Sequence, residues 1–313
     1  MWTIFQPKCI IFGKNSAKEF PYIENSLIIT SKGAKSRGWL DYLKIKNFQI
    51  FDEILPNPSI DIAEKIISDF SSTKIDCVIG IGGGSVMDFA KFVGANLQKK
   101  KILIPTTFGS GSEVTKISVL NVNGKKTSFH EERFLADVAI VDSNFILDTP
   151  DTVIKNSIID ACAQCTEAYD SNNSNYYTKF LCEKAFNILE EAITNNDFEK
   201  APLGALMTGL GFGNSSTTLG HALSYVFSNE GYSHGHALAY CTSVAHKFNS
   251  SKFYERFIKL VEILEFPKIK LKQNVDSASE IIFKDRKHLD NNPQTVTKNN
   301  IVDLLNEIKS IWN

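Results

Sequence analysis

Residues that could bind a metal ion gather in the second half of the chain. Asp160 and Gln164 are four residues apart in a segment with helical periodicity, so they share one face of a helix. His221, His234 and His236 follow within a short stretch. One carboxylate with two imidazoles suits a divalent first-row metal and leaves coordination positions open. Sequence spacing alone does not show that these side chains meet, and each also has an ordinary structural explanation.

A second group of residues could bind phosphate. A predicted strand at 76–81 runs into Gly82-Gly83-Gly84-Ser85, and a predicted helix covers 85–96. Glycines let the backbone approach a ligand closely, and the start of a helix presents free N–H groups to an anion. Strand-to-helix turns also need glycine for geometry alone. Asp88 and Lys91 are spaced to form an ordinary ion pair on the helix.

A loop rich in hydroxyl groups strengthens the phosphate interpretation. It follows a short predicted strand at 101–105 and contains Thr106, Thr107 and Ser110 among its polar residues. Two such loops at the carboxyl ends of strands in one sheet predict a nucleotide site.

The elements that must position these residues divide the chain in two. Further strands are predicted at 26–30 and 137–142 and a helix at 61–70, so residues 1–149 are predicted to form a parallel α/β domain. Beyond Pro150 the strand signals end, and residues 150–313 are predicted to form an all-helical domain. Helices are expected at 151–169, 176–195, 201–212, 217–227, 236–248, 251–264 and 299–313. The polar stretch 286–300 is expected to be mobile.

Composition excludes several classes of protein. Lys plus Arg number 34 against 35 Asp plus Glu, which predicts no general affinity for nucleic acid or for an anionic membrane. No apolar run is long enough to span a bilayer, and the first residues lack the features of a secretory signal, so a cytoplasmic location is expected. Six cysteines are too sparse for a disulfide scaffold, and Cys162 and Cys165 are interpreted as helix packing residues.

Several motifs together resemble the iron-containing (group III) alcohol dehydrogenases. They are Gly82-Gly83-Gly84-Ser85 with Asp88 and Lys91, Pro105-Thr106-Thr107 with Gly109-Ser110-Gly111, Asp160-Ala161 with Glu167-Ala168-Tyr169, and His221-Ala222-Leu223 with His234-Gly235. The resemblance runs from about residue 2 to 250 and implies a dehydroquinate synthase-like fold, with a Rossmann-like N-terminal domain and a helical C-terminal domain.

The resemblance also assigns the metal site. It implies that Asp160, His221 and His234 bind a divalent metal, Fe²⁺ or Zn²⁺. Gln164 stands where the family generally has a third histidine, and Tyr225 stands where many members have a second one. A glutamine oxygen is a weaker ligand, so Gln164 is a candidate ligand whose contribution is open.

These departures resemble the phosphonoacetaldehyde reductase branch. That branch implies reduction of a small aldehyde with a phosphonate to 2-hydroxyethylphosphonate, in an enzyme expected to be a homodimer. Lys126, Arg133 and His236 are then candidates to bind the anionic tail. His236 and Lys126 are also the candidate catalytic residues, with His236, the cofactor ribose or a water molecule returning the proton.

The expected cofactor is NADPH or NADH. Many relatives that prefer NAD have an aspartate after the strand that ends at residue 30, and this chain has Ser31 there, followed by Lys32 and Arg37. The missing carboxylate favours NADPH. The predicted cofactor-binding residues are Ser31, Gly83, Gly84, Ser85, Asp88, Thr106, Thr107, Ser110 and Lys126.

Two alternatives stay open. The same fold hosts metal-dependent cyclases of the dehydroquinate synthase-like type, although their metal carboxylate is typically Glu and this chain has Asp160. In the other alternative Gln164 marks the loss of the metal, and the chain is a catalytically silent nucleotide-binding homologue.

Overall fold

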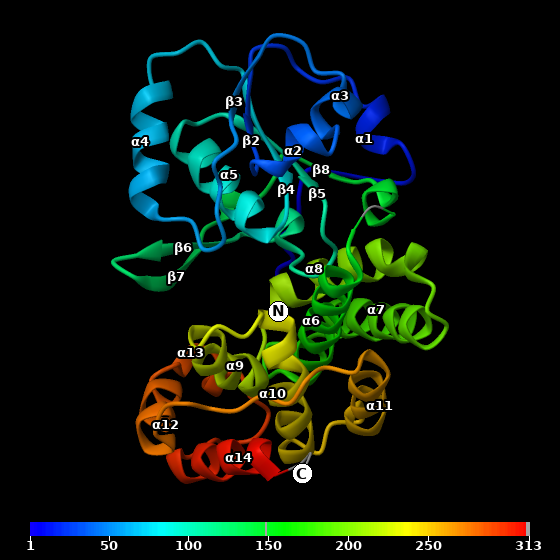
Figure 1. The fold of residues 1–313 in the computed structure, drawn as a ribbon, viewed down its shortest axis with the longest axis vertical. Coiled ribbons are helices and arrows are strands. Elements are labelled where there is room, and N and C mark those ends of the chain that lie inside the picture. Colours follow the sequence, from blue (N-terminus) through cyan, green and yellow to red (C-terminus); the bar gives the residue numbers. More distant parts are fainter. Residues whose placement is uncertain (148, 311–313) are drawn as a thin grey trace. The chain divides into compact units, whose positions relative to one another are not determined.

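The structure is a computed structural model that describes residues 1–147 and 149–310. The chain divides into two compact units, one essentially Thr3–Thr149 and the other Pro150–Asn313. The first contains a sheet and short helices, and the second is helical (Figure 1). None of the described helices is long and apolar enough to span a membrane.

The first unit is built on a parallel sheet. Within the described residues its strands lie in the order β1-β8-β5-β4-β2-β3. Their bounds are Cys9–Phe12 (β1), Ser26–Ile29 (β2), Phe48–Phe51 (β3), Cys77–Gly82 (β4), Lys100–Pro105 (β5) and Val138–Val141 (β8). β2, β4 and β5 are almost wholly buried apolar runs, as expected of a parallel sheet.

Helices and a hairpin complete this unit. The helices are α1 (Ser16–Glu19), α2 (Gly33–Ser36), α3 (Trp39–Leu43), α4 (Ile60–Phe70) and α5 (Gly84–Asn96). The antiparallel hairpin consists of β6 (Ile117–Val122) and β7 (Lys125–His130). The sequence patterns found β2, β4, β5, β8, α4 and α5. They missed the hairpin and the edge strands β1 and β3, whose side chains are largely exposed and lack the buried apolar signature.

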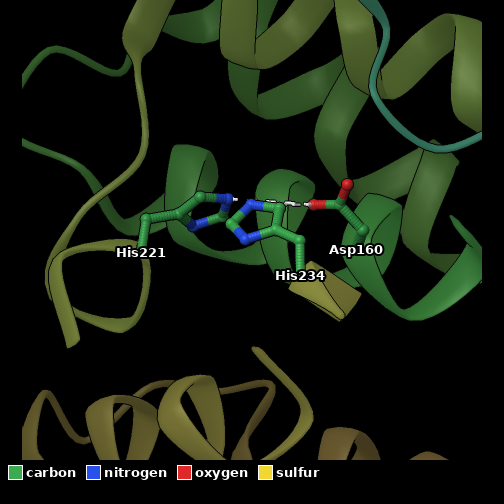
Figure 2. A group of neighbouring side chains, drawn as sticks. All are labelled: Asp160, His221 and His234. Atoms are coloured by element: carbon green, nitrogen blue, oxygen red, sulfur yellow. Dashed lines mark ion pairs between the residues drawn. The ribbon is translucent and has the colours of Figure 1, made fainter. Parts of the chain in front are cut away.

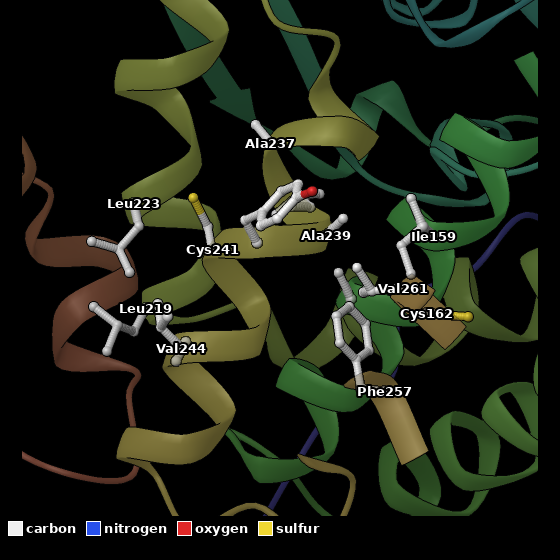
Figure 3. Close-up of a cluster of buried hydrophobic side chains, with 14 of the residues drawn as sticks. Ile159, Cys162, Leu219, Leu223, Ala237, Ala239, Cys241, Val244, Phe257 and Val261 are labelled. Carbon is white, nitrogen blue, oxygen red and sulfur yellow. The ribbon is translucent and has the colours of Figure 1, made fainter. Parts of the chain in front are cut away.

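The second unit packs its helices around one apolar core. They are α6 (Asp151–Asp170), α7 (Tyr176–Thr194), α8 (Ala201–Ser215), α9 (Leu219–Asn229), α10 (His234–Phe248), α11 (Tyr254–Leu264), α12 (Val275–Phe283), α13 (Arg286–Asp290) and α14 (Lys298–Ser310). Figure 3 shows the core between α6, α9, α10 and α11, with Cys162 and Cys241 among its apolar side chains. Cys162 and Cys165 are both buried in this core, which matches the packing interpretation.

The prediction of a mobile stretch at 286–300 is wrong. Residues 286–290 form α13, and the turn after it is fixed by buried amides. Asn291 donates to the backbone carbonyls of Ser215 and Thr217, at 2.8 and 3.0 Å. Asn292 and Asn249 exchange side-chain hydrogen bonds of 2.8 Å. The polar composition that suggested mobility instead supplies hydrogen bonds that anchor the segment to the helical core.

Candidate metal centre and cofactor site

Three helices of the second unit bring Asp160, His221 and His234 together. Asp160 lies in α6, His221 near the start of α9, and His234 is the first residue of α10. Two glycines permit the close packing that this requires. A Cβ atom on Gly220 would lie 2.0 Å from Oε1 of Glu167, and one on Gly235 would lie 2.0 Å from the carbonyl oxygen of Asn156. Larger residues at these positions would push α9 and α10 away from α6.

The three side chains converge on one point, as Figure 2 shows. One potential ligand atom from each lies within 4.8 Å of the other two. Oδ1 of Asp160 is 3.9 Å from Nε2 of His221 and 3.9 Å from Nε2 of His234. These separations are too long for hydrogen bonds. They suit atoms that share a cation, because metal–ligand bonds of about 2.0–2.2 Å hold ligand atoms roughly 3–3.5 Å apart.

Glu167 orients His221. Its buried carboxylate accepts from Nδ1 of His221 at 3.1 Å and from the backbone N–H of Thr218 at 2.6 Å. Despite burial, which acts in the opposite direction, His221 and the hydrogen bonds lower the pKa of Glu167 to about 2, so the carboxylate is ionised. An imidazole whose Nδ1–H is donated to a carboxylate presents the lone pair of Nε2, the arrangement found in metal-binding histidines. Glu167 is therefore a positioning residue that sequence reasoning did not include in the site.

Two buried polar atoms beside the cluster have no hydrogen-bond partner among the described residues. One is Nε2 of His221 and the other is Oε1 of Gln164. The amide of Gln164 donates from Nε2 to Oδ1 of Asp160 at 2.8 Å. Leaving such groups unpaired in the interior costs about 1–3 kcal/mol each, and a bound cation would satisfy both. The donor set and its unmet bonding capacity thus fit a divalent metal held by Asp160, His221 and His234, with Oε1 of Gln164 available as a further ligand while its N–H supports Asp160.

The pKa shifts of the side chains in this cluster also favour a bound cation. Burial raises the pKa of Asp160 to about 6, against the lowering effects of His221 and Gln164. Burial alone would lower the pKa of His221, but the carboxylates of Glu167 and Asp160 outweigh it and the pKa is raised. A divalent cation would remove the need for protons on both ligands, because it supplies the positive charge that they otherwise lack.

Aromatic side chains outside the predicted set border this cluster. The ring of His288 stacks on that of His221, with centroids 6.3 Å apart and planes at 16°. Tyr225 stacks on His234 at 6.3 Å and meets His288 edge-on at 5.8 Å. Nδ1 of His288 is 2.7 Å from Oδ2 of Asp285. Asp285 is the N-cap of α13 and His288 lies three residues later, within the stretch that sequence reasoning expected to be mobile.

His236 does not join the cluster. It lies two residues after His234 on α10, and that spacing turns the two side chains to nearly opposite faces of a helix. Its Nε2 contacts the carbonyl oxygen of Pro267, and its ring packs against Tyr232, Tyr240 and Phe266. The structure thus gives His236 a packing position away from the cluster, and its role in returning the proton stays a prediction.

In the first unit, Gly83 and Gly84 face the hydroxyl loop. A Cβ atom on Gly83 would lie 3.1 Å from Oγ1 of Thr107, and one on Gly84 would lie 3.0 Å from Oγ of Ser110. The backbone N–H of Thr106 donates to the carbonyl of Gly82 at 2.9 Å, which holds the two loops side by side. The arrangement combines hydroxyl groups with the exposed N–H groups at the start of α5, as a phosphate site requires.

Asp88 joins the hydroxyl loop to α5. Its Oδ1 accepts from Oγ of Ser112 at 2.5 Å and lies 3.1 Å from Nζ of Lys91. Lys91 is fully buried and also donates to the carbonyl oxygen of Ser112 at 2.8 Å. These bonds commit Asp88 to fixing the hydroxyl loop on α5. The contacts of Asp88 match the ordinary ion-pair interpretation, and direct cofactor binding by Asp88 stays a prediction.

The remaining predicted residues lie elsewhere in the first unit. Ser31 follows β2 at its carboxyl end, and Ser85 approaches the backbone N–H of Asn57 with its Oγ at 3.4 Å. Lys126 is exposed on β7. Arg133 is already engaged, because its guanidinium binds Glu131 at 2.5 Å and Asn96 at 3.1 Å.

Two family models match the chain. The model described as "Iron-containing alcohol dehydrogenase" matches residues 7–143, and "Fe-containing alcohol dehydrogenase family, C-terminal" matches residues 154–284. The chain belongs to the iron-containing alcohol dehydrogenase family. The predicted family is thus confirmed, and the family is one of oxidoreductases.

Curated relatives carry names of alcohol and aldehyde oxidoreductases. The chain is 34% identical over 205 residues to long-chain-alcohol dehydrogenase 1 of Geobacillus thermodenitrificans, covering 56% of this chain and 52% of that protein. It is 28% identical over 246 residues to sulfoacetaldehyde reductase of Bilophila wadsworthia, covering 69% and 64%. The matches therefore span about half to two thirds of the length of these relatives.

Solved structures confirm the predicted fold class. Sulfoacetaldehyde reductase from Bifidobacterium kashiwanohense in complex with NAD⁺ superposes with a TM-score of 0.89 at 22% identity, covering 99% of each chain. An iron-containing alcohol dehydrogenase gives a TM-score of 0.88 at 23% identity, covering 98% of this chain and 99% of that one. A parallel-sheet N-terminal domain followed by a helical domain is therefore the fold of this family member.

Proposed function

We propose that the protein is a metal-dependent NAD(P)H oxidoreductase that reduces a small aldehyde to an alcohol. The observation that supports this best is the convergence of Asp160, His221 and His234, with Nε2 of His221 buried and unpaired. When bound, the metal would polarise the aldehyde oxygen as a Lewis acid, and the nicotinamide would supply hydride to the carbonyl carbon.

The residues of this chain would hold the reacting groups. Asp160, His221 and His234 would bind the cation, Glu167 would keep the Nδ1–H tautomer of His221, and Gln164 would hold the Asp160 carboxylate. The proposed cofactor site consists of the Gly82–Ser85 turn with Thr106, Thr107 and Ser110, whose N–H and hydroxyl groups suit a pyrophosphate.

The proposed substrate carries a small anionic group, with phosphonoacetaldehyde as the leading candidate. The support is the resemblance at Gln164 and Tyr225 together with the relatives named as sulfoacetaldehyde reductases, whose names imply a similar aldehyde with a sulfonate. A homodimeric state stays a prediction, to be tested by light scattering.

The decisive experiment is a substrate screen with metal analysis. The purified protein is assayed with phosphonoacetaldehyde, sulfoacetaldehyde and propionaldehyde, with NADH or NADPH, after loading with Fe²⁺ or Zn²⁺. Reduction of an aldehyde that depends on added metal supports the proposal. A protein that neither binds metal nor turns over any aldehyde is the silent homologue instead.

Cofactor preference is a separate part of the proposal. Ser31 places no carboxylate at the end of β2, and Lys32 is exposed nearby, although it lies 3.9 Å from Glu53. We expect kcat/KM with NADPH to equal or exceed that with NADH, because nothing at Ser31 repels a 2′-phosphate. Initial rates at matched cofactor concentrations test this, and a strong preference for NADH would contradict it.

A further inference from the structure

The start of α10 is held by a side chain of α6. His234 is the first residue of α10, and the side chain of its N-cap, Ser233, makes no capping hydrogen bond with the helix in the described part of the chain. Instead, the backbone N–H of His236 in the first turn donates to Oδ1 of Asn156 at 3.0 Å. The hydroxyl of Ser233 donates to the same oxygen at 2.5 Å. Asn156 therefore satisfies a backbone donor that an N-cap side chain normally satisfies, but it does so from another helix.

The rest of Asn156 fixes this contact in place. Its Nδ2 donates to the carbonyl oxygen of Thr152 at 2.7 Å, one turn earlier in α6. A Cβ atom on Gly235 would lie 2.0 Å from the carbonyl oxygen of Asn156 and 2.9 Å from its Cα, so the first turn of α10 lies directly against the backbone of α6. The carboxamide is thus held at both ends, by α6 through its nitrogen and by α10 through its oxygen.

We propose that Asn156 positions the metal ligand His234. Its carboxamide links the first turn of α10 to α6, the helix that carries Asp160, and so sets the separation between two ligands from different helices. This inference rests on the proposed metal-dependent function and adds a positioning residue that lies outside the metal cluster.

The first step of the argument is position. Asn156 and Asp160 are four residues apart on one face of α6, and Gln164 continues that face by a further turn. Oδ1 of Asp160 lies 3.9 Å from Nε2 of His234. The contact made by Asn156 and the approach of the two ligands are therefore separated by about 6 Å along the axis of α6. A shift of the α10 start at Asn156 would change the separation of the two ligands.

The second step is the place of His234 in its helix. The first turn of a helix opens more easily than its interior, because its N–H groups lack intrahelical partners. The side chain of His234 is 36% exposed, against 6% for that of His221, so surrounding side chains enclose it less. Glu167 orients the ring of His221 as well. The placement of His234 therefore depends more strongly on the backbone of the first turn, which Asn156 holds.

A role in stability alone is the alternative. Loss of a helix cap destabilises a fold wherever the helix lies, without altering a particular metal site. Asn274 offers a matched control, because it is the N-cap of α12 and its Oδ1 accepts from the backbone N–H groups of Asp276 and Ser277, at 2.8 and 3.3 Å. α12 lies outside the three helices that carry the proposed ligands.

The test compares Asn156→Ala with Asn274→Ala in the full chain. The Kd for Zn²⁺ is measured by competition with a chelator, and the visible absorption of bound Co²⁺ reports the geometry of the ligands. Thermal denaturation of the metal-free proteins measures the loss of stability. Hydrogen exchange measures the protection of the backbone N–H groups in the first turn of α10. These readouts need no turnover.

We expect Asn156→Ala to raise the Kd for Zn²⁺ about tenfold, to change the Co²⁺ absorption and to speed up exchange in the first turn of α10. Asn274→Ala should leave all three unchanged and lower the melting temperature by a similar amount. The extended backbone of Ser233 lets its released hydroxyl cap α10 locally in Asn156→Ala, so a loss of metal affinity there would not follow from an uncapped helix. An unchanged Kd, or an equal change of Kd in both variants, would overturn the assignment.

Failure of the proposed function gives a different pattern. If the wild-type protein binds Zn²⁺ but reduces no aldehyde, the proposed reaction is wrong, and the comparison of Kd values still supports or overturns the role of Asn156. A wild-type protein that binds neither Zn²⁺ nor Co²⁺ refutes both. If Asn156→Ala does not fold, Asn156→Leu carries the same comparison, since leucine keeps the branched shape of asparagine but cannot accept a hydrogen bond.

Discussion

The two candidate sites use different kinds of binding group. In the first unit, the Gly82–Ser85 turn and the Thr106–Ser110 loop offer backbone N–H groups and hydroxyls at the carboxyl ends of β4 and β5. In the second unit, the cluster of Asp160, His221 and His234 consists of ionisable side chains on three helices, supported by the buried Glu167. The first follows from local chain geometry, and the second depends on tertiary packing.

This difference explains how each site should respond to substitution. A backbone site is damaged mainly by added bulk, because the groups that bind cannot themselves be mutated away. A side-chain site is lost when one ligand is removed, because the other charges are then left buried without compensation. Metal content and cofactor binding, measured on the same variants, therefore separate the two sites.

The largest expected effect is removal of a metal ligand. His221→Ala should reduce aldehyde reduction by about a thousandfold or more, because Lewis-acid stabilisation supplies several kcal/mol to the transition state. Metal content should fall as well, whereas NADPH binding measured by fluorescence should persist. Turnover that survives in both His221→Ala and His234→Ala would refute the metal mechanism.

The next effect concerns Glu167, whose carboxylate orients His221. Glu167→Gln should weaken metal binding roughly 10- to 100-fold, because an amide no longer fixes the Nδ1–H form of His221. The measurement is metal affinity by competition with a chelator, and cofactor affinity serves as the internal control. Metal affinity equal to that of the wild type would show that Glu167 contributes only to packing.

A smaller effect is expected in the glycine turn. A side chain at residue 84 would meet Ser110, whose Oγ is 3.0 Å from the position of an added Cβ. Gly84→Val should raise the Kd for NADPH by about tenfold or more, because it fills the space that a pyrophosphate would need. Metal content should not change. If the Kd stays the same, the phosphate lies elsewhere and the contrast between the two sites fails.

The smallest effect concerns a buried carboxyl beneath the hydroxyl loop. Burial raises the pKa of Glu113 from 4.5 to about 7. Between these values the folded protein keeps a proton that the unfolded chain has lost, so stability falls as pH rises through this window. Relative to Glu113→Gln, which does not titrate, the wild type should lose about 1–3 kcal/mol between pH 4.5 and 8. Thermal denaturation at several pH values measures the difference, and parallel curves would contradict it.

Sequence patterns alone indicate the candidate phosphate site more completely than the candidate metal site. A run of glycines directly after a buried strand indicates a phosphate-binding turn from the local sequence alone. Parallel pairing of β5 with β4 then brings the hydroxyl loop beside that turn. For the histidines, residue type and spacing were equally compatible with metal binding and with core packing. His234 joins the cluster, His236 packs against Phe266, and His246 instead lies 2.8 Å from Oγ1 of Thr166 in the core.

His288 shows why the surroundings of the metal cluster could not be predicted from the sequence. It stands outside the motifs, in a segment whose polar residues resembled a loop, and only the packing of α13 against α9 reveals its neighbours. The ligand set itself came from the family resemblance. The structure then added the residues around it, Glu167, Tyr225 and His288, whose roles depend on contacts between helices distant in sequence.

Because the proposed metal ligands lie on α6, α9 and α10, metal binding would also link metal supply to the lifetime of the protein. An ion that binds only the folded cluster joins three helices distant in sequence, and at a free concentration one hundred times its Kd it adds about 2.7 kcal/mol to the stability of the fold. A chain made under metal limitation would lack this contribution and unfold more often. Its abundance would then fall together with its activity. Scarcity of the metal would therefore lower both the amount of the protein and the fraction of it that carries metal.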